Sequence, residues 1–77
     1  MVLRMNKKLA IDNVRNYPAE TVEQLRRLLA AGALAHADPH RDNFYELENG
    51  SRAFYIHVYG DKVLLLAAWP KRAAANA

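Results

Sequence analysis

The chain has 77 residues, 52% hydrophobic and 25% charged, a balance typical of one globular domain rather than a disordered segment. It contains no cysteine, which excludes disulfides, thiolate metal sites and cysteine nucleophiles. The net charge of +3 is smaller than a dedicated nucleic-acid-binding domain usually carries, so nucleic acid is not the favoured partner. A domain this short buries only about 60% of its unfolded surface, so its margin of stability is thin.

The longest apolar run, residues 63–69, is far shorter than the roughly 20 residues of a membrane helix. The basic residues near the N-terminus are not followed by the apolar stretch that a secretion signal needs. We therefore expect a cytoplasmic protein that does not contact a membrane.

The first sixteen residues do not select one structure. Their apolar residues are spaced for a short strand or a loose helix, and a flexible, partly docked arm fits equally well. We treat residues 1–16 as an N-terminal arm of uncertain structure.

An amphipathic helix is predicted over residues 18–31. Pro18 suits the first helical position, where its missing N–H would have no partner. An apolar stripe then recurs at spacings of three and four residues, with Glu23 and Arg27 placed to pair on the wet side. Gly32 suits a left-handed C-cap. The stripe consists of Val22, Leu25, Leu28 and Leu29.

Residues 33–42 are expected to be a connection, and three strands follow at about residues 43–48, 52–59 and 62–69. The dipeptide Asn49-Gly50 is a strong hairpin signal, because a type I′ turn needs positive φ at both positions. Gly60-Asp61 is the second turn signal. The predicted fold is α+β, one helix packed on a three-stranded antiparallel meander, within a single domain at residues 17–70 and a disordered tail at 71–77.

Two-residue loops at these turns fix the register of the predicted sheet. The first pairs Leu47 with Arg52 and Tyr45 with Phe54, and the second pairs Ile56 with Leu65 and Phe54 with Ala67. Directly paired residues share a face. The predicted core face therefore consists of Tyr45, Leu47, Phe54, Ile56, Val58, Val63, Leu65, Ala67 and Trp69.

The second face of the predicted sheet is mixed, whereas a solvated face should be mostly polar. Three covers would explain its apolar residues: the N-terminal arm, a second copy in a homodimer, or a different protein partner. We predict a non-enzymatic interaction domain that acts through this face, with no cofactor. The candidate interface residues are Phe44, Tyr55, His57, Tyr59, Leu64 and Leu66.

Two other patterns have simpler explanations. His36, Asp38, His40 and Asp42 alternate like metal ligands, but Asp38-Pro39 is ordinary turn chemistry, so no metal site is predicted. His57 between two tyrosines has the residue type of a general base or a base-stacking platform. No nucleophile or acid stands at a telling spacing from it, and we predict no catalytic residue.

The stretches Tyr45-Glu46-Leu47, Arg52-Ala53-Phe54-Tyr55 and residues 63–66, followed by Trp69 and Lys71-Arg72, resemble the C-terminal sheet of RelE/HigB-like toxins. The resemblance covers residues 44–72. It implies an alternative function, cleavage of messenger RNA on the ribosome by one partner of a toxin–antitoxin pair. It also implies that Arg52, Tyr55, Lys71 and Arg72 contact RNA.

Overall fold

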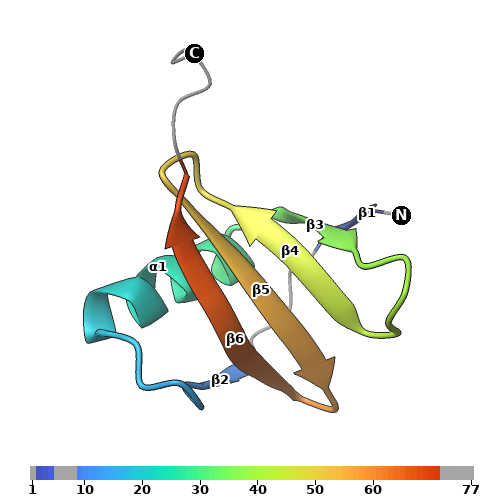
Figure 1. The fold of residues 1–77 in the computed structure, drawn as a ribbon, viewed down its shortest axis with the longest axis horizontal. Helices are drawn as coiled ribbons and strands as arrows, with labels where there is room; N and C mark the ends of the chain where they lie inside the picture. The colour runs from blue at the N-terminus through green and yellow to red at the C-terminus, as the bar shows by residue number, and fades with distance from the viewer. Residues whose placement is uncertain (1, 5–8, 72–77) are drawn as a thin grey trace.

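The computed structural model describes residues 2–4 and 9–71, which form one helix and six strands. The strands are β1 (Val2–Arg4), β2 (Ala10–Asp12), β3 (Leu34–Ala37), β4 (Phe44–Glu48), β5 (Arg52–Tyr59) and β6 (Lys62–Pro70). The helix α1 (Ala19–Ala30) lies against one face of the sheet (Figure 1). Among these residues, no helix has the length and apolar character that crossing a membrane requires.

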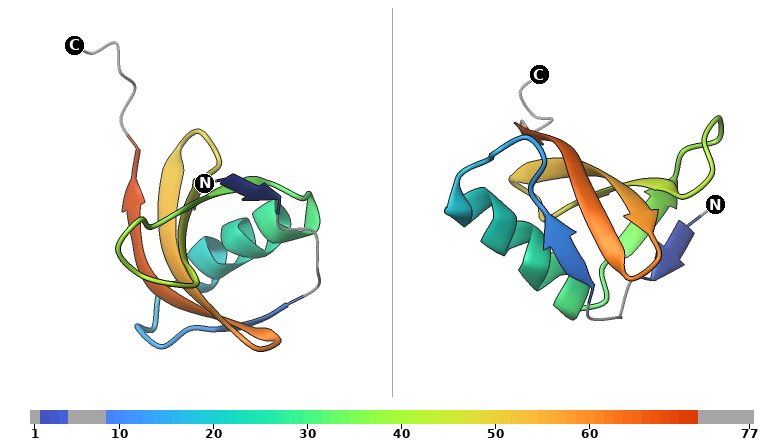
Figure 2. Two further views of the ribbon diagram at one scale, coloured as in Figure 1. Left: turned by 90° about the vertical axis from the view of Figure 1, so that its right-hand side faces the viewer. Right: turned by 90° about the horizontal axis from the view of Figure 1, so that it is seen from below.

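The predicted α+β class is confirmed, but the prediction of a three-stranded sheet is wrong. The three strands β4, β5 and β6 do form an antiparallel meander. They are the centre of a six-stranded mixed sheet in the order β1-β3-β4-β5-β6-β2. Two of the additional pairs, β1 with β3 and β2 with β6, join parts of the chain that are far apart in sequence, and β2 runs parallel to β6. Figure 2 shows the strong twist that curves this sheet around α1.

The helix agrees with its prediction to within one residue at each end. Pro18 is the N-cap, and Gly32 has the positive φ of 72° that a left-handed C-cap requires. Leu25 and Leu29 are buried, with Val22 and Leu28 packed beside them, so the predicted stripe faces the core. On the exposed side, the Glu23 carboxylate lies 3.5 Å from Nε of Arg27.

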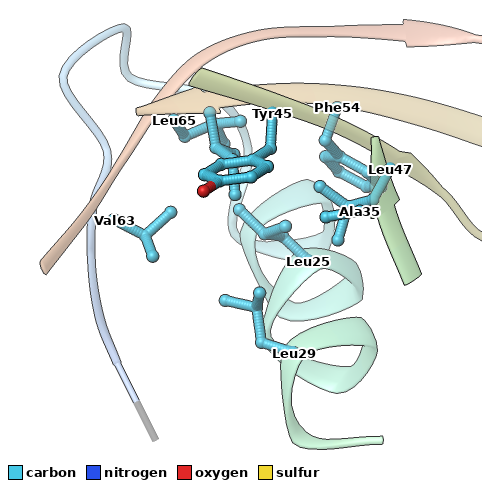
Figure 3. Close-up of a cluster of buried hydrophobic side chains, with 9 residues drawn as sticks. Leu25, Leu29, Ala35, Tyr45, Leu47, Phe54, Val63 and Leu65 are labelled. Carbon is cyan, nitrogen blue, oxygen red and sulfur yellow. The ribbon is translucent and has the colours of Figure 1, made fainter. Parts of the chain in front are cut away.

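The core lies between α1 and the concave face of the sheet, which we call the helix-side face (Figure 3). Phe54 and Ile56 of β5 and Val63 and Leu65 of β6 are fully buried there, as is Leu25 of the helix. Each Å² of apolar surface removed from water contributes about 25 cal/mol, so the burial of these five side chains stabilises the fold.

The N-terminal arm and the predicted connection both contain strands. Leu34–Ala37 pairs with β1 on one side and β4 on the other, so the prediction of a connection over residues 33–42 is wrong for this strand and agrees with the structure only at residues 33 and 38–42. Leu9 and Ile11 pack against the core on the helix-side face, so this part of the arm extends the sheet and does not cover its second face. Met5 and the tail from residue 72 lie outside the described residues.

The register of the first hairpin differs from the prediction by two residues. Leu47 pairs with Phe54 and Tyr45 with Ile56, because the loop spans residues 49–52 and not only Asn49-Gly50. The Asn49 side chain holds this wider loop, since its Oδ1 accepts hydrogen bonds from the backbone N–H of Ser51 at 2.9 Å and of Arg52 at 2.8 Å. Side chains alternate with a period of two, so the slip leaves every residue on its predicted face.

We expect Asn49→Ala to destabilise the protein by about 1–2 kcal/mol, since it removes three hydrogen bonds to Oδ1, two from backbone N–H groups and one from the Ser51 hydroxyl at 3.2 Å. Urea unfolding measures the change. Ser51→Ala, which removes only the exposed hydroxyl bond and retains both backbone N–H donors, is the matched control and should stay within about 0.5 kcal/mol of the wild type. Equal stability of the two variants would mean that the asparagine does not fix the loop.

The second hairpin has the predicted two-residue turn and then a β-bulge. Val58 pairs with Val63 and Ile56 with Leu65, as predicted. The next pair is Tyr55 with Ala67, so Leu66 is an extra residue in β6. This one-residue shift reverses the faces beyond it. The predictions that Ala67 and Trp69 lie on the core face are therefore wrong.

Candidate interaction surface

The second face of the sheet, which we call the outer face, has no helix over it in the described part of the chain (Figures 1 and 2). Its residues follow from the register. The central rows are Phe44–His57–Leu64 and Glu46–Tyr55–Ala67, with Tyr59 at one end and Trp69 at the other. Tyr59 is 67% exposed and Trp69 is 39% exposed. Five of the six predicted interface residues thus share this face, and Leu66 lies at the bulge.

The aromatic residues of this face form a continuous group, the aromatic row, which consists of Phe44, Tyr55, His57 and Tyr59. The ring of Phe44 stacks on that of His57 at 4.2 Å between centroids and on that of Tyr55 at 5.8 Å. His57 in turn lies 6.2 Å from Tyr59. Such stacks provide rigid contact area, because few side-chain rotations remain to be lost on binding.

Two polar contacts at the start of β4 hold the aromatic row in place. The guanidinium of Arg41 lies over the ring of Phe44, 4.7 Å from its centroid. Nδ1 of His57 lies 3.2 Å from the carbonyl oxygen of Asn43, which fits a proton on that nitrogen. Asn43 has a φ of 68°, and this left-handed residue turns the chain into β4.

Asp38 anchors the other side of the aromatic row. Its Oδ2 accepts a hydrogen bond from the Tyr55 hydroxyl at 2.6 Å, and its Oδ1 accepts one from the backbone N–H of His40 at 2.8 Å. The bond from Tyr55, followed by that from His40, lowers the pKa of Asp38 below its ordinary value of 3.8. The same bond to Asp38 raises the pKa of Tyr55 above 10.0. A hollow of about 160 Å³ lies beside this pair, lined also by His36 and Glu46.

This pair predicts a dependence of stability on pH. Because the folded pKa of Asp38 is lowered, its contribution is present above pH 3.8 and is lost as the pH falls through the lowered value. We expect Tyr55→Phe to be less stable than the wild type at pH 7, and the difference to shrink as Asp38 protonates. Tyr59→Phe is the control. The measurement is an NMR titration of the Asp38 carboxyl, and an unchanged pKa in Tyr55→Phe would contradict the assignment.

Charges of both signs lie around the aromatic row. Arg41 and Lys62 are the positively charged residues, and Glu46 and Asp12 are the negatively charged ones. Glu48 accepts a hydrogen bond from Nζ of Lys71 at 2.7 Å. That contact raises the pKa of Lys71. A phosphate backbone needs a surface with an excess of cations, whereas protein interfaces combine aromatic residues with a polar rim of both signs. The outer face has the composition of a protein interface.

The residues assigned to RNA contact by the toxin resemblance do not form one group among those described. Arg52 is on the helix-side face, where its Nη1 donates to Oγ1 of the buried Thr21 at 3.2 Å. Tyr55 is on the outer face, and Lys71 pairs with Glu48 beyond the end of β6. Arg72 lies outside the described residues.

The alternating residues of the predicted connection do not converge on one point. Among residues 2–4 and 9–71, no three histidine or carboxylate side chains lie close enough to hold an ion. His36 is on β3 in register with Glu46, while the Asp38 carboxylate is occupied by Tyr55 and the turn at His40. The interpretation of Asp38-Pro39 as a turn therefore agrees with the structure.

No protein-family model matches the chain, and no significant match is found among curated proteins or solved structures.

Three residues of the surface were missed by the sequence reasoning. Asp38 and Arg41 precede β4, and nothing in their local spacing indicates that the chain turns back to place them beside Phe44 and Tyr55. Trp69 was assigned to the core, because a bulge has no reliable sequence signal. The run of three leucines at residues 64–66 is one indication, since any of them can take a core position.

Proposed function

We propose that this chain is a non-enzymatic binding domain whose outer face contacts another protein surface, and that the first partner is a second copy of the chain. The single observation that carries the proposal is the aromatic row, in which the half-buried Phe44, Tyr55 and His57 stack beside the exposed Tyr59 on a sheet face that no helix covers in the described part of the chain. Large contiguous apolar patches are uncommon on monomeric proteins and mark sites of interaction.

The composition of the outer face supports a protein partner. Tyrosine, tryptophan and arginine are the residues that most often dominate binding energy at protein interfaces. Here Arg41, Tyr55 and Tyr59 lie beside Phe44 and His57, and Trp69 is on the same face. The stacks and the bond from Tyr55 to Asp38 fix these side chains before binding, which lowers the entropy lost on association.

The balance of charge supports a second copy as the partner. Arg41 and Lys62 are offset by Glu46 and Asp12, so two outer faces can meet without the repulsion of like-charged surfaces. A closed two-fold dimer uses the same patch on both copies. Dimerisation also stabilises a domain of 77 residues, because the small core of such a domain provides little stability by itself.

Sedimentation equilibrium tests the proposal with two matched variants. We expect Tyr59→Glu to weaken self-association at least tenfold, because it places a charge within the apolar contact. Val14→Glu is the control, since Val14 is also exposed, at 46%, but precedes α1 and is not part of the outer face. Equal effects of the two substitutions would contradict the use of this face. A wild type that stays at 8.7 kDa at every concentration would exclude the second copy and leave a different protein as the partner.

The second candidate function is cleavage of RNA, as in the toxins that residues 44–72 resemble. The observation in its favour is the half-buried Arg52, whose Nε has no partner among the described residues. A guanidinium is suited to binding a phosphate, but this Nε is buried and Nη1 donates to Thr21. Tyr55 and Lys71, however, lie away from it and are engaged with Asp38 and Glu48.

Expression in bacteria separates the two functions. A toxin relative should arrest growth, and Arg52→Lys should relieve the arrest, because lysine keeps the charge but loses the planar geometry for phosphate. A binding domain should permit growth with either residue. Arg27→Lys, on the exposed side of α1, is the control.

A further inference from the structure

One edge of the sheet is only partly covered by a neighbouring strand. On the side away from β5, β6 pairs with β2 at residues 62–64 and then continues to Pro70. In the sheet order, no described strand follows β2 on that side. Figure 2 shows β2 beside the first part of β6 and the chain leaving toward α1. Among the described residues, the second half of β6 therefore has no strand beside it on that side.

This edge belongs to the most apolar segment of the chain. Residues 63–69 are seven hydrophobic residues without a charge, a proline or a glycine. Short, uncharged segments rich in β-forming residues add to one another when their edges are free. An unprotected edge at this position would recruit β6 of another molecule.

The hydroxyl of Tyr17 occupies the edge. The backbone N–H of Ala68 donates a hydrogen bond to it at 3.0 Å, so the donor that an added strand would use is already satisfied. Asn13 fixes the position of Tyr17 through two bonds of 2.8 Å: Nδ2 donates to the carbonyl oxygen of Tyr17, and the N–H of Tyr17 donates to Oδ1.

Pro70 removes the next donor. The N–H of Lys71 donates to the carbonyl oxygen of Ser51, on the β5 side of the strand. Successive N–H groups along a strand point to alternate sides, so the nitrogen of Pro70 faces the open edge, as that of Ala68 does. A proline has no N–H, and it is tolerated in a strand where the donor would otherwise face solvent.

We propose that Tyr17 and Pro70 together close the edge of β6 against strand addition by β6 of a second copy. Tyr17 supplies an acceptor for the outward N–H of Ala68, and Pro70 has no N–H at the next outward position. Assembly is thereby directed away from the edge and toward the outer face. The two routes use different residues and are separable by mutation.

Hydrogen exchange tests the first part of the proposal. Tyr17→Phe keeps the ring and removes the hydroxyl, so the Ala68 amide should exchange about tenfold faster, the effect of losing one hydrogen bond. The Ile56 amide reports global unfolding and should change little. Tyr59→Phe is the matched control and should leave Ala68 unchanged. An Ala68 amide that exchanges equally in the two variants would overturn the role of Tyr17.

Light scattering tests the second part. We expect Tyr17→Phe combined with Pro70→Val to form open-ended oligomers that grow with concentration and gain strand signal in circular dichroism. Pro70→Val alone, which keeps Tyr17, should remain a small species and show that the substitution does not disrupt the fold. Adding Tyr59→Glu to the double variant should not prevent this growth, because the contact is at the edge. A double variant with the wild-type assembly state would overturn the proposal.

Discussion

Deleting Leu66 is expected to leave a folded protein, whereas deleting Tyr55, which lies across the same hairpin, is expected to unfold it. Leu66 is the extra residue of the bulge, and Ala67 remains opposite Tyr55 when Leu66 is absent. The loss is limited to the partly buried side chain, about 1–2 kcal/mol. Residues 67–70 lie on the same faces of the sheet with and without Leu66.

The deletion of Tyr55 has no such compensation. Either Phe54 leaves the core face or His57 enters it, because one missing residue reverses the alternation on one side of the gap. A large cavity or a buried imidazole costs about 3–5 kcal/mol, comparable with the whole stability of a small domain. Thermal unfolding by circular dichroism measures both variants. If deleting Leu66 also abolished the transition, Leu66 would be a paired residue and the bulge would be absent.

The second large effect is expected at the two phenylalanines, which lie on opposite faces of the same sheet. Phe54 is fully buried between the sheet and α1. Phe54→Ala should cost about 3–5 kcal/mol and leave little folded protein at 25 °C. Phe44 is only partly buried on the outer face.

Phe44→Ala is the matched control for that variant. It should retain the fold with a loss of about 1–2 kcal/mol, because it removes the stacking with His57 and the contact with Arg41 but opens no cavity in the core. It should also weaken self-association. Urea unfolding together with sedimentation distinguishes the two consequences. Equal destabilisation by the two substitutions would mean that the outer face is packed like the core.

The helix and the central strands were predictable because their signals are local. Pro18, the leucine stripe and Gly32 lie within one short stretch and determine the start, face and end of α1. Asn49-Gly50 located a reversal correctly even though the loop is two residues longer than predicted. Because the error is even, the outer-face positions of Phe44 and Tyr55 were still predicted correctly.

The edge strands and the bulge were not predictable for a physical reason. β1 and β2 have three residues each and exist through pairing with β3 and β6, which are distant in sequence. In β3, Ala35 is the only fully buried residue, so the segment has little hydrophobic periodicity. The bulge turns Trp69 outward, and the three adjacent leucines conceal the change of face.

The sequence predicted which residues share the candidate surface, but not the contacts that hold them in place. Tyr55, His57, Tyr59 and Leu64 follow from strand alternation alone. The contacts that fix the aromatic row come from Asp38 and Arg41, in a turn whose path depends on β3 joining the sheet. The alternation of residues along a strand predicts the face on which each residue lies. Contacts from a loop can be identified only from the tertiary structure.

The most direct measurement is an isotope-filtered NMR experiment on a mixture of labelled and unlabelled protein at high concentration, which detects only contacts between molecules. If two copies meet through their outer faces, cross-peaks should connect Phe44, Tyr59 and Leu64 with aromatic protons of the partner copy. Cross-peaks confined to α1, or no cross-peaks from a sample that sedimentation shows to be associated, would contradict the assignment of the outer face as the contact surface.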